Sequence, residues 1–342
     1  MSGLTAFCVG PKSFMVVRFF LGVAEAGLFP GIVLFMTYWF PERHRARIMA
    51  YFTLALPLAV AAGAPMSTAL LELNGVWGLA GWKWMYIAEA APTVVIGIAI
   101  LFYVTDRPAE AHWLAPAERA WLGDTIDAER RRIEARRKIS IWRSFWDPKV
   151  LLLALNYFGI VTASLGMLLF LPQIVKQLGL TNMQVGWASM LPYICGAISM
   201  GVWGWISDRM GERRWNLFWS CALSTVGLVI AGLFVGTWWS LVGMCIAATG
   251  LYGTKGPFWS MPSALLTGAA AASGIAWINS IGNLGGFFGP SIVGFVRQST
   301  GSFAGGLYAL AAFGLMSSVV AAFWLKQPRH AEDEELAAAP AE

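Results

Sequence analysis

Residues 13–40 read SFMVVRFFLGVAEAGLFPGIVLFMTYWF, and this stretch decides which class of protein the chain belongs to. Its apolar run is longer than the roughly 20 residues that a helix needs to cross the hydrocarbon core of a bilayer. Yet it holds two ionisable side chains, Arg18 and Glu25. A buried helix of a soluble protein could also hold such a pair, so the rest of the chain has to decide.

The composition of the whole chain favours a membrane protein. Of its 342 residues, 57% are hydrophobic and 13% are charged, whereas about a quarter of an ordinary soluble domain is charged. The sequence therefore predicts an all-α integral membrane protein. We expect nine transmembrane helices, one for each long apolar run, at residues 14–40, 48–71, 84–105, 150–175, 184–206, 215–236, 238–261, 274–296 and 303–325.

The basic residues divide unevenly between the two sides of the membrane. When successive loops are assigned to alternate sides, eighteen fall on one side, and the other side has four, Lys12, Lys83, Lys176 and Arg297. Basic loops stay in the cytoplasm. We therefore predict a multi-pass protein of the inner (plasma) membrane, in contact with the lipid bilayer, whose loop 106–149 and C-terminus are cytoplasmic. The net charge of +5 is then a topology signal, and no nucleic-acid partner is expected.

The long polar segment 106–149 has ten basic and eight acidic residues. Its partial apolar stripe predicts a helix lying on the cytoplasmic surface. The sequence has no GxSxG, GxGxxG or phosphate-loop motif, and its three His and four Cys lack metal-ligand or paired spacing. We predict no enzyme activity, no cofactor and no metal.

Three segments resemble the anion:cation symporter family of the major facilitator superfamily, whose bacterial members import tartrate, phthalate, galactonate and similar carboxylates. They are RFFLGVAEAGLFPGIVLFMTYWFPERHRARIMAYF (18–52), GWISDRMGERR (204–214) and KGPFWSMPSALLTGAAAASGIAWINSIGNLGGFFGPSIVGF (255–295). The resemblance implies two six-helix bundles joined by a cytoplasmic loop. The nine helices would be family helices four to twelve. The family's first two helices and most of its third would be absent, which leaves the stump Met1–Gly10.

The resemblance also implies a domain layout and a function. The expected domains are a remnant of the N-terminal bundle at 1–105, a linker at 106–149, the C-terminal bundle at 150–326 and an acidic tail at 327–342. The expected function is proton-coupled symport of an organic anion, such as a sugar acid, tartrate or an aromatic dicarboxylate, by an alternating-access monomer. The alternatives are a truncated, non-transporting membrane fragment and an integral membrane enzyme. Coupling to sodium stays open.

Arg18 and Glu25 are the first candidate site residues. Because they are seven residues apart, a helix would place them within about 20° on one face and about 10.5 Å apart along its axis. That is too far for the usual helical ion pair, which joins residues three or four positions apart. A charge near the bilayer centre costs about 2.5–3.5 kcal/mol and usually marks a pathway, although an interhelical ion pair is the alternative. By the resemblance, Arg18 binds the substrate anion and Glu25 carries the coupled proton.

Further candidates are polar or aromatic residues within apolar runs. Those predicted to bind substrate are Lys255, Asn279, Asn283, Asn156, Tyr157 and Trp259. The alternatives are that Lys255 reaches towards an interface, that the Asn residues connect helices, and that Trp259 serves packing. The resemblance assigns gating to Gly204, Asp208, Arg209, Gly211, Arg213 and Arg214, although these charges could serve only to set the topology.

Overall fold

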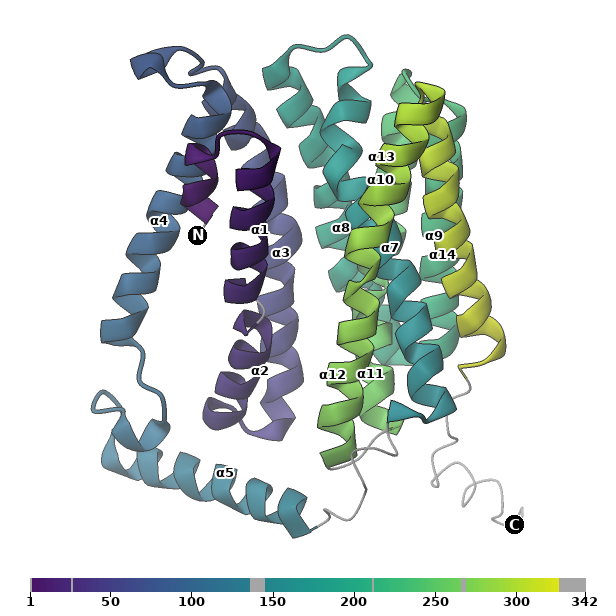
Figure 1. Ribbon diagram of the computed structural model, residues 1–342. Helices are drawn as coiled ribbons and strands as arrows, with labels where there is room; N and C mark the ends of the chain where they lie inside the picture. The colour runs from purple at the N-terminus through teal and green to yellow at the C-terminus, as the bar shows by residue number, and fades with distance from the viewer. Residues whose placement is uncertain (1, 26, 136–144, 211, 266–268, 326–342) are drawn as a thin grey trace, which may run out of the picture. The chain divides into compact units, whose positions relative to one another are not determined.

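A computed structural model describes residues 2–25, 27–135, 145–210, 212–265 and 269–325 (Figure 1). Within these ranges the regular structure is entirely helical. The chain divides into two compact units, the first formed by residues 1–136 with 182–187 and the second by 137–181 with 188–342. The predicted acidic tail 327–342, Gly211 and part of the linker, 136–144, lie outside the described residues.

In the part of the first unit that the structure describes there are five α-helices, of which the third and fourth are the longest. Three short 3₁₀ segments, Ser2–Phe7, Val76–Gly78 and Pro108–Glu110, separate or precede them. The predicted helix within 106–149 is present as α5. In chain order the α-helices are α1 (Pro11–Glu25), α2 (Leu28–Trp39), α3 (Glu42–Leu71), α4 (Gly81–Tyr103) and α5 (Pro116–Ala135).

Among its described residues the second unit has eight α-helices, although the first turns of α8 are grouped with the first unit. The start of α7 is fixed locally, since the Asp147 carboxylate accepts a hydrogen bond from the Lys149 amide at 2.8 Å and Pro148 occupies the first turn. The helices are α7 (Pro148–Lys176), α8 (Asn182–Met210), α9 (Arg213–Leu233), α10 (Trp238–Gly253), α11 (Lys255–Leu265), α12 (Ala269–Asn283), α13 (Gly285–Thr300) and α14 (Ala304–Phe323).

The nine predicted apolar runs are all helical, but three of them are interrupted. Among the described residues, six helices are long and apolar enough to cross a membrane. Each of the other three runs forms two shorter helices, α1 with α2, α10 with α11 and α12 with α13. The interruptions fall beside predicted site residues: Glu25 ends α1, Lys255 begins α11 and Asn283 ends α12.

Local chemistry accounts for two of these interruptions. Pro257 has no amide hydrogen, so the Gly253 carbonyl loses its partner four residues ahead at the junction of α10 and α11. At the junction of α12 and α13, the Leu284 amide bonds to the Ile281 carbonyl at 3.1 Å and the Phe287 amide to the Leu284 carbonyl at 3.0 Å. These three-residue steps tighten the helix into a 3₁₀ turn.

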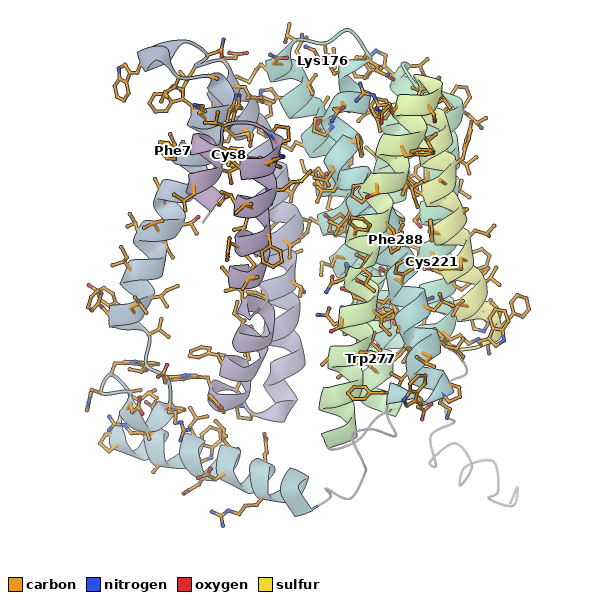
Figure 2. All side chains as sticks on the ribbon, in the orientation of Figure 1. Phe7, Cys8, Lys176, Cys221, Trp277 and Phe288 are labelled. Atoms are coloured by element: carbon orange, nitrogen blue, oxygen red, sulfur yellow. The ribbon has the colours of Figure 1, made fainter. Side chains whose placement is uncertain are left out.

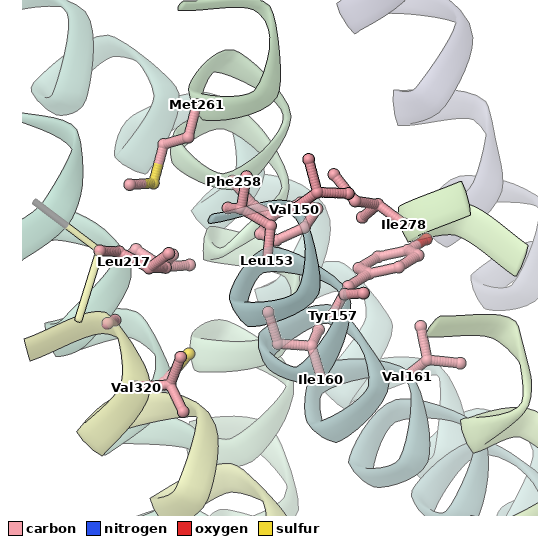
Figure 3. Close-up of a cluster of buried hydrophobic side chains, with 14 residues drawn as sticks. Val150, Leu153, Tyr157, Ile160, Val161, Leu217, Phe258, Met261, Ile278 and Val320 are labelled. Carbon is pink, nitrogen blue, oxygen red and sulfur yellow. The ribbon is translucent and has the colours of Figure 1, made fainter. Parts of the chain in front are cut away.

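The two units differ in how their helices pack. In the first, α4 carries side chains that extend away from the other helices of the unit (Figure 2). Most of its apolar side chains are exposed, including Val95, Leu101 and Phe102. In the second, α7 contributes Val150, Leu153 and Ile160 to a buried cluster that also includes residues of α9, α11, α12 and α14 (Figure 3). This cluster positions the aromatic and charged residues of the candidate site in the second unit.

Candidate functional site

Arg18 lies on α1 and is held by residues of α1 and α4. Its Nη2 donates a hydrogen bond to the Tyr86 hydroxyl at 2.7 Å, and its guanidinium carbon lies 5.1 Å from the Phe14 ring centre and 5.7 Å from that of Tyr86. No carboxylate of the described residues pairs with it. The described part of the chain therefore provides no ion pair for Arg18, and its partners there are two aromatic side chains, Phe14 and the phenol Tyr86.

Glu25 is the last residue of α1 and its side chain is exposed. Within the described ranges it has no hydrogen-bond or ion-pair partner. Its carboxylate is therefore not committed to Arg18 or to another described cation. The proton-coupling role assigned to Glu25 stays a prediction.

Lys255 begins α11 and lies in aromatic surroundings. Its Nζ is 5.5 Å from the ring centre of Tyr157 on α7. The Tyr157 ring stacks on Phe258, with centres 4.9 Å apart, and meets Trp259 edge to face at 5.0 Å. Figure 3 shows the Tyr157 ring in the same cluster as Phe258 and Ile278. Tyr157 on α7 is thus a neighbour of both Lys255 and Trp259, which lie four residues apart on α11 and far from Tyr157 in the sequence.

The ammonium of Lys255 has no oppositely charged neighbour in the part of the chain that the structure describes. A cation over an aromatic face gains about 0.5–2 kcal/mol, which is less than the cost of removing an ammonium from water. Lys255 is half-buried, so some solvent or ligand access remains. The position is suited to an anion that would complete the neutralisation.

The three predicted asparagines lie in different surroundings. Asn156 is fully buried, and its Nδ2 donates to the Ser317 carbonyl on α14 at 2.6 Å. This contact is the helix-connecting role that was the alternative for Asn156. Asn279 is half-buried and Asn283 is exposed, one helical turn apart on α12, with no hydrogen-bond partner among the described residues.

The α12 surface that carries Asn279 packs close to Tyr157. A Cβ atom placed on Gly282 would lie 2.0 Å from Cδ1 of Tyr157, so only glycine permits this approach of α12 to α7. Ile278, the residue before Asn279, belongs to the same buried cluster as Tyr157. The amide of Asn279 is therefore carried by a helix that contacts the Tyr157 ring.

The predicted gate segment, 204–214, joins α8 to α9. Arg209 lies over Trp205, with its guanidinium carbon 5.3 Å from the ring centre. Arg214 donates from Nε to the Ala321 carbonyl at 3.3 Å and from Nη2 to the Ala322 carbonyl, both in the last turn of α14. A cation at a helix C-terminus satisfies free carbonyls and the helix dipole. Gly211 and the side chain of Asp208 lie outside the description.

A scan against protein-family models matches the Major Facilitator Superfamily over residues 1–290 and, in a second overlapping match, 166–341. The chain belongs to the major facilitator superfamily. The expected superfamily resemblance and all-α membrane fold are thereby confirmed. In the solved structure of a bacterial homologue of the human lysosomal transporter Spinster, 79% of that chain superposes on 95% of this one with a TM-score of 0.69 and 15% sequence identity. That likeness concerns the fold alone.

Two curated relatives extend the comparison. The chain is 46% identical over 320 residues to "Putative tartrate transporter" of Agrobacterium vitis, covering 94% of this chain and 74% of the relative. It is 36% identical over 319 residues to "Quinolone resistance transporter" of Acinetobacter baumannii, with coverage of 92% and 74%. The chain is a multi-pass membrane transporter of a small molecule, and it is not an enzyme.

Two residues at these sites, Tyr86 and Phe258, were missed by the sequence reasoning. Tyr86 meets Arg18 across 68 positions of the chain, and a tyrosine within an apolar run carries no signal of such pairing. Phe258 precedes Trp259 and follows Lys255 by three residues, so helical spacing could have indicated that it shares the Lys255 face.

Proposed function

We propose that this superfamily member is a secondary active transporter that imports an organic anion together with a proton, by alternating access. The substrate class would be a carboxylate such as tartrate, a sugar acid or an aromatic dicarboxylate. The proposal extends to this chain the substrate named for the Agrobacterium vitis relative. It keeps the predicted domain layout, a monomer, the inner membrane, and a cytoplasmic linker and C-terminus.

The observation that carries the proposal is the surroundings of Lys255. A lysine within an apolar helix pair, in contact with Tyr157 and without a carboxylate neighbour among the described residues, needs an anion for full neutralisation. Trp259 and the amides of Asn279 and Asn283 would offer packing and hydrogen bonds to the rest of the substrate. Asn156, whose amide is engaged with α14, is assigned a supporting role in placing Tyr157.

The roles proposed in the first unit follow from charge. Arg18 can bind a carboxylate through a two-pronged, charge-assisted hydrogen bond. Protonation of Glu25 would respond to the charge of an anion bound at Arg18, because a neighbouring negative charge favours the protonated carboxyl group. In the gate, Arg209, Arg213 and Arg214 would form a cytoplasmic latch with Gly204, Asp208 and Gly211.

The test is uptake of labelled tartrate, phthalate and galactonate into proteoliposomes containing the purified protein, with and without an outside-acid pH gradient. A labelled quinolone, suggested by the Acinetobacter baumannii relative, serves as the competing substrate class. We expect gradient-dependent accumulation of at least one carboxylate. Lys255→Gln should reduce the affinity for that anion at least tenfold, whereas the control Lys176→Gln, at the end of α7, should leave it unchanged.

Glu25→Gln separates coupling from binding. It should abolish accumulation driven by the pH gradient while preserving exchange of internal for external anion. Loss of both activities would contradict the coupling role. If the folded protein neither transports nor binds any of the carboxylates, the anion-import proposal fails and the non-transporting alternative gains support.

A further inference from the structure

The contact between Arg18 and Tyr86 leaves both groups able to bind a ligand. A tyrosine hydroxyl has one donor hydrogen and two acceptor positions, and a guanidinium has five N–H donors. Because the Tyr86 oxygen accepts the bond from Arg18, at 2.7 Å, the hydroxyl hydrogen is not used in this contact. Among the described residues, nothing accepts that hydrogen, and no carboxylate engages the remaining N–H groups of Arg18.

The surrounding rings restrict where these two groups can point. Phe14, one helical turn before Arg18 on α1, lies 5.1 Å from the guanidinium carbon. Trp82, one turn before Tyr86 on α4, meets the Tyr86 ring edge to face at 6.4 Å. A side chain already restricted by packing loses less conformational freedom when a ligand binds. Arg18 and Tyr86 therefore form a pre-arranged pair of donors.

We propose that Tyr86 is a substrate-binding residue that works as one unit with Arg18. The guanidinium binds one carboxylate of the transported anion, and the Tyr86 hydroxyl donates its free hydrogen to an oxygen of the same carboxylate. The phenol oxygen continues to accept from Arg18, which polarises its O–H bond and strengthens the donation. This inference rests on the proposed function and adds to it a residue that the sequence did not indicate.

The pair selects for a carboxylate over a neutral group of similar shape. The Arg18 guanidinium and the Tyr86 hydroxyl both offer hydrogen-bond donors, and the guanidinium is permanently charged. A ligand must therefore bring acceptors on two adjacent oxygens. A carboxylate provides these with a full negative charge, whereas an amide would place donor hydrogens against donors. The ligand class assigned to this site is therefore the ionised carboxylate.

Tyr86→Phe is the sharpest variant, because it removes the hydroxyl and keeps the ring beside Arg18 and Trp82. Tyr103→Phe is its matched control, since Tyr103 ends the same helix and is 84% exposed. Binding of labelled tartrate, phthalate and galactonate to the purified protein is measured by equilibrium binding, with thermal stability recorded in parallel. Hydrogen bonds to charged groups predict a loss of affinity of about tenfold or more for Tyr86→Phe. The melting temperature should stay unchanged.

A double-mutant cycle with Arg18→Lys tests whether the two residues act together. We expect Arg18→Lys to weaken binding. The double variant should be little weaker than Arg18→Lys alone, because the clamp formed by the Arg18 and Tyr86 donors is already broken. Strictly additive losses, or unchanged affinity in Tyr86→Phe, would overturn the clamp. If the unaltered protein binds none of the three anions, the proposed function itself fails, and the clamp with it.

Discussion

Gly27–Gly31 and Gly285–Gly289 are the same motif, two glycines four residues apart in an apolar run, and they lie in different surroundings. A Cβ atom on Gly285 would lie 2.5 Å from the Phe158 carbonyl oxygen, and one on Gly289 would lie 2.2 Å from that of Thr162. For Gly27 and Gly31, no atom of the described residues lies within 4 Å of such a Cβ. Gly285 and Gly289 therefore allow α13 to pack closely on α7, whereas the helix surface at Gly27 and Gly31 has no such contact with the described residues.

The two units repeat this difference on a larger scale. Among the residues whose burial the structure describes, the largest fully buried side chains, such as Phe258, Leu217 and Phe303, all belong to the second unit. There, α9 and α10 approach so closely that a Cβ on Gly227 would lie 2.2 Å from the Ala247 amide nitrogen. In the first unit, by contrast, the most apolar stretch of α4 has no residue that is buried by the described part of the chain. Small residues permit close packing, but only where a partner helix is present.

The largest effect should come from filling a close contact. Gly289→Ala should lower the free energy of unfolding by about 3 kcal/mol, because the new methyl group meets the Thr162 backbone, which cannot move as a flexible side chain would. The measurement is thermal or denaturant unfolding of the purified protein in detergent. Gly31→Ala is the control, with an expected change within about 0.5 kcal/mol. Equal destabilisation by both would show that the two motifs do not differ.

A smaller effect should separate asparagines that connect helices from those that face a ligand. Asn156→Ala removes the 2.6 Å bond to the Ser317 carbonyl and should cost about 1 kcal/mol, within the range known for hydrogen bonds between membrane helices. Asn279→Ala should leave stability unchanged and weaken anion binding several-fold. Unfolding and equilibrium binding are measured on both variants. The reverse pattern would exchange the two roles.

The smallest effect concerns the helix end at the predicted gate. Arg214→Gln removes the charged donor to the last carbonyls of α14 and should cost about 0.5–1 kcal/mol. Arg213→Gln, for which the described structure gives no partner, should cost less. Thermal unfolding of both variants is measured at low and at high salt. Because salt screens charges, the difference in stability between the two variants should be smaller at high salt. A larger loss for Arg213→Gln would contradict the capping role.

Much of the fold was predictable because the bilayer imposes it. A chain in lipid must satisfy its backbone hydrogen bonds within each segment, so nine apolar runs indicated helices before any packing was known. The interruptions at Glu25, Lys255 and Asn283 were less predictable. Only the one at Lys255 has a clear signal in the sequence, in Gly253, Gly256 and Pro257, because a proline within a helix removes a specific hydrogen bond.

The sequence by itself determined the class of protein, the helical runs and the isolated charges Arg18, Glu25 and Lys255, because these follow from composition, spacing and the cost of charge in lipid. The superfamily was indicated by the resemblance of three sequence segments to a known family. Only the tertiary structure decided which side chains meet: Tyr86 with Arg18, Tyr157 with Lys255, and Asn156 with Ser317. The physical reason is that these contacts join residues far apart in the chain. Their geometry depends on how closely two helices approach, and a one-dimensional pattern does not contain that distance.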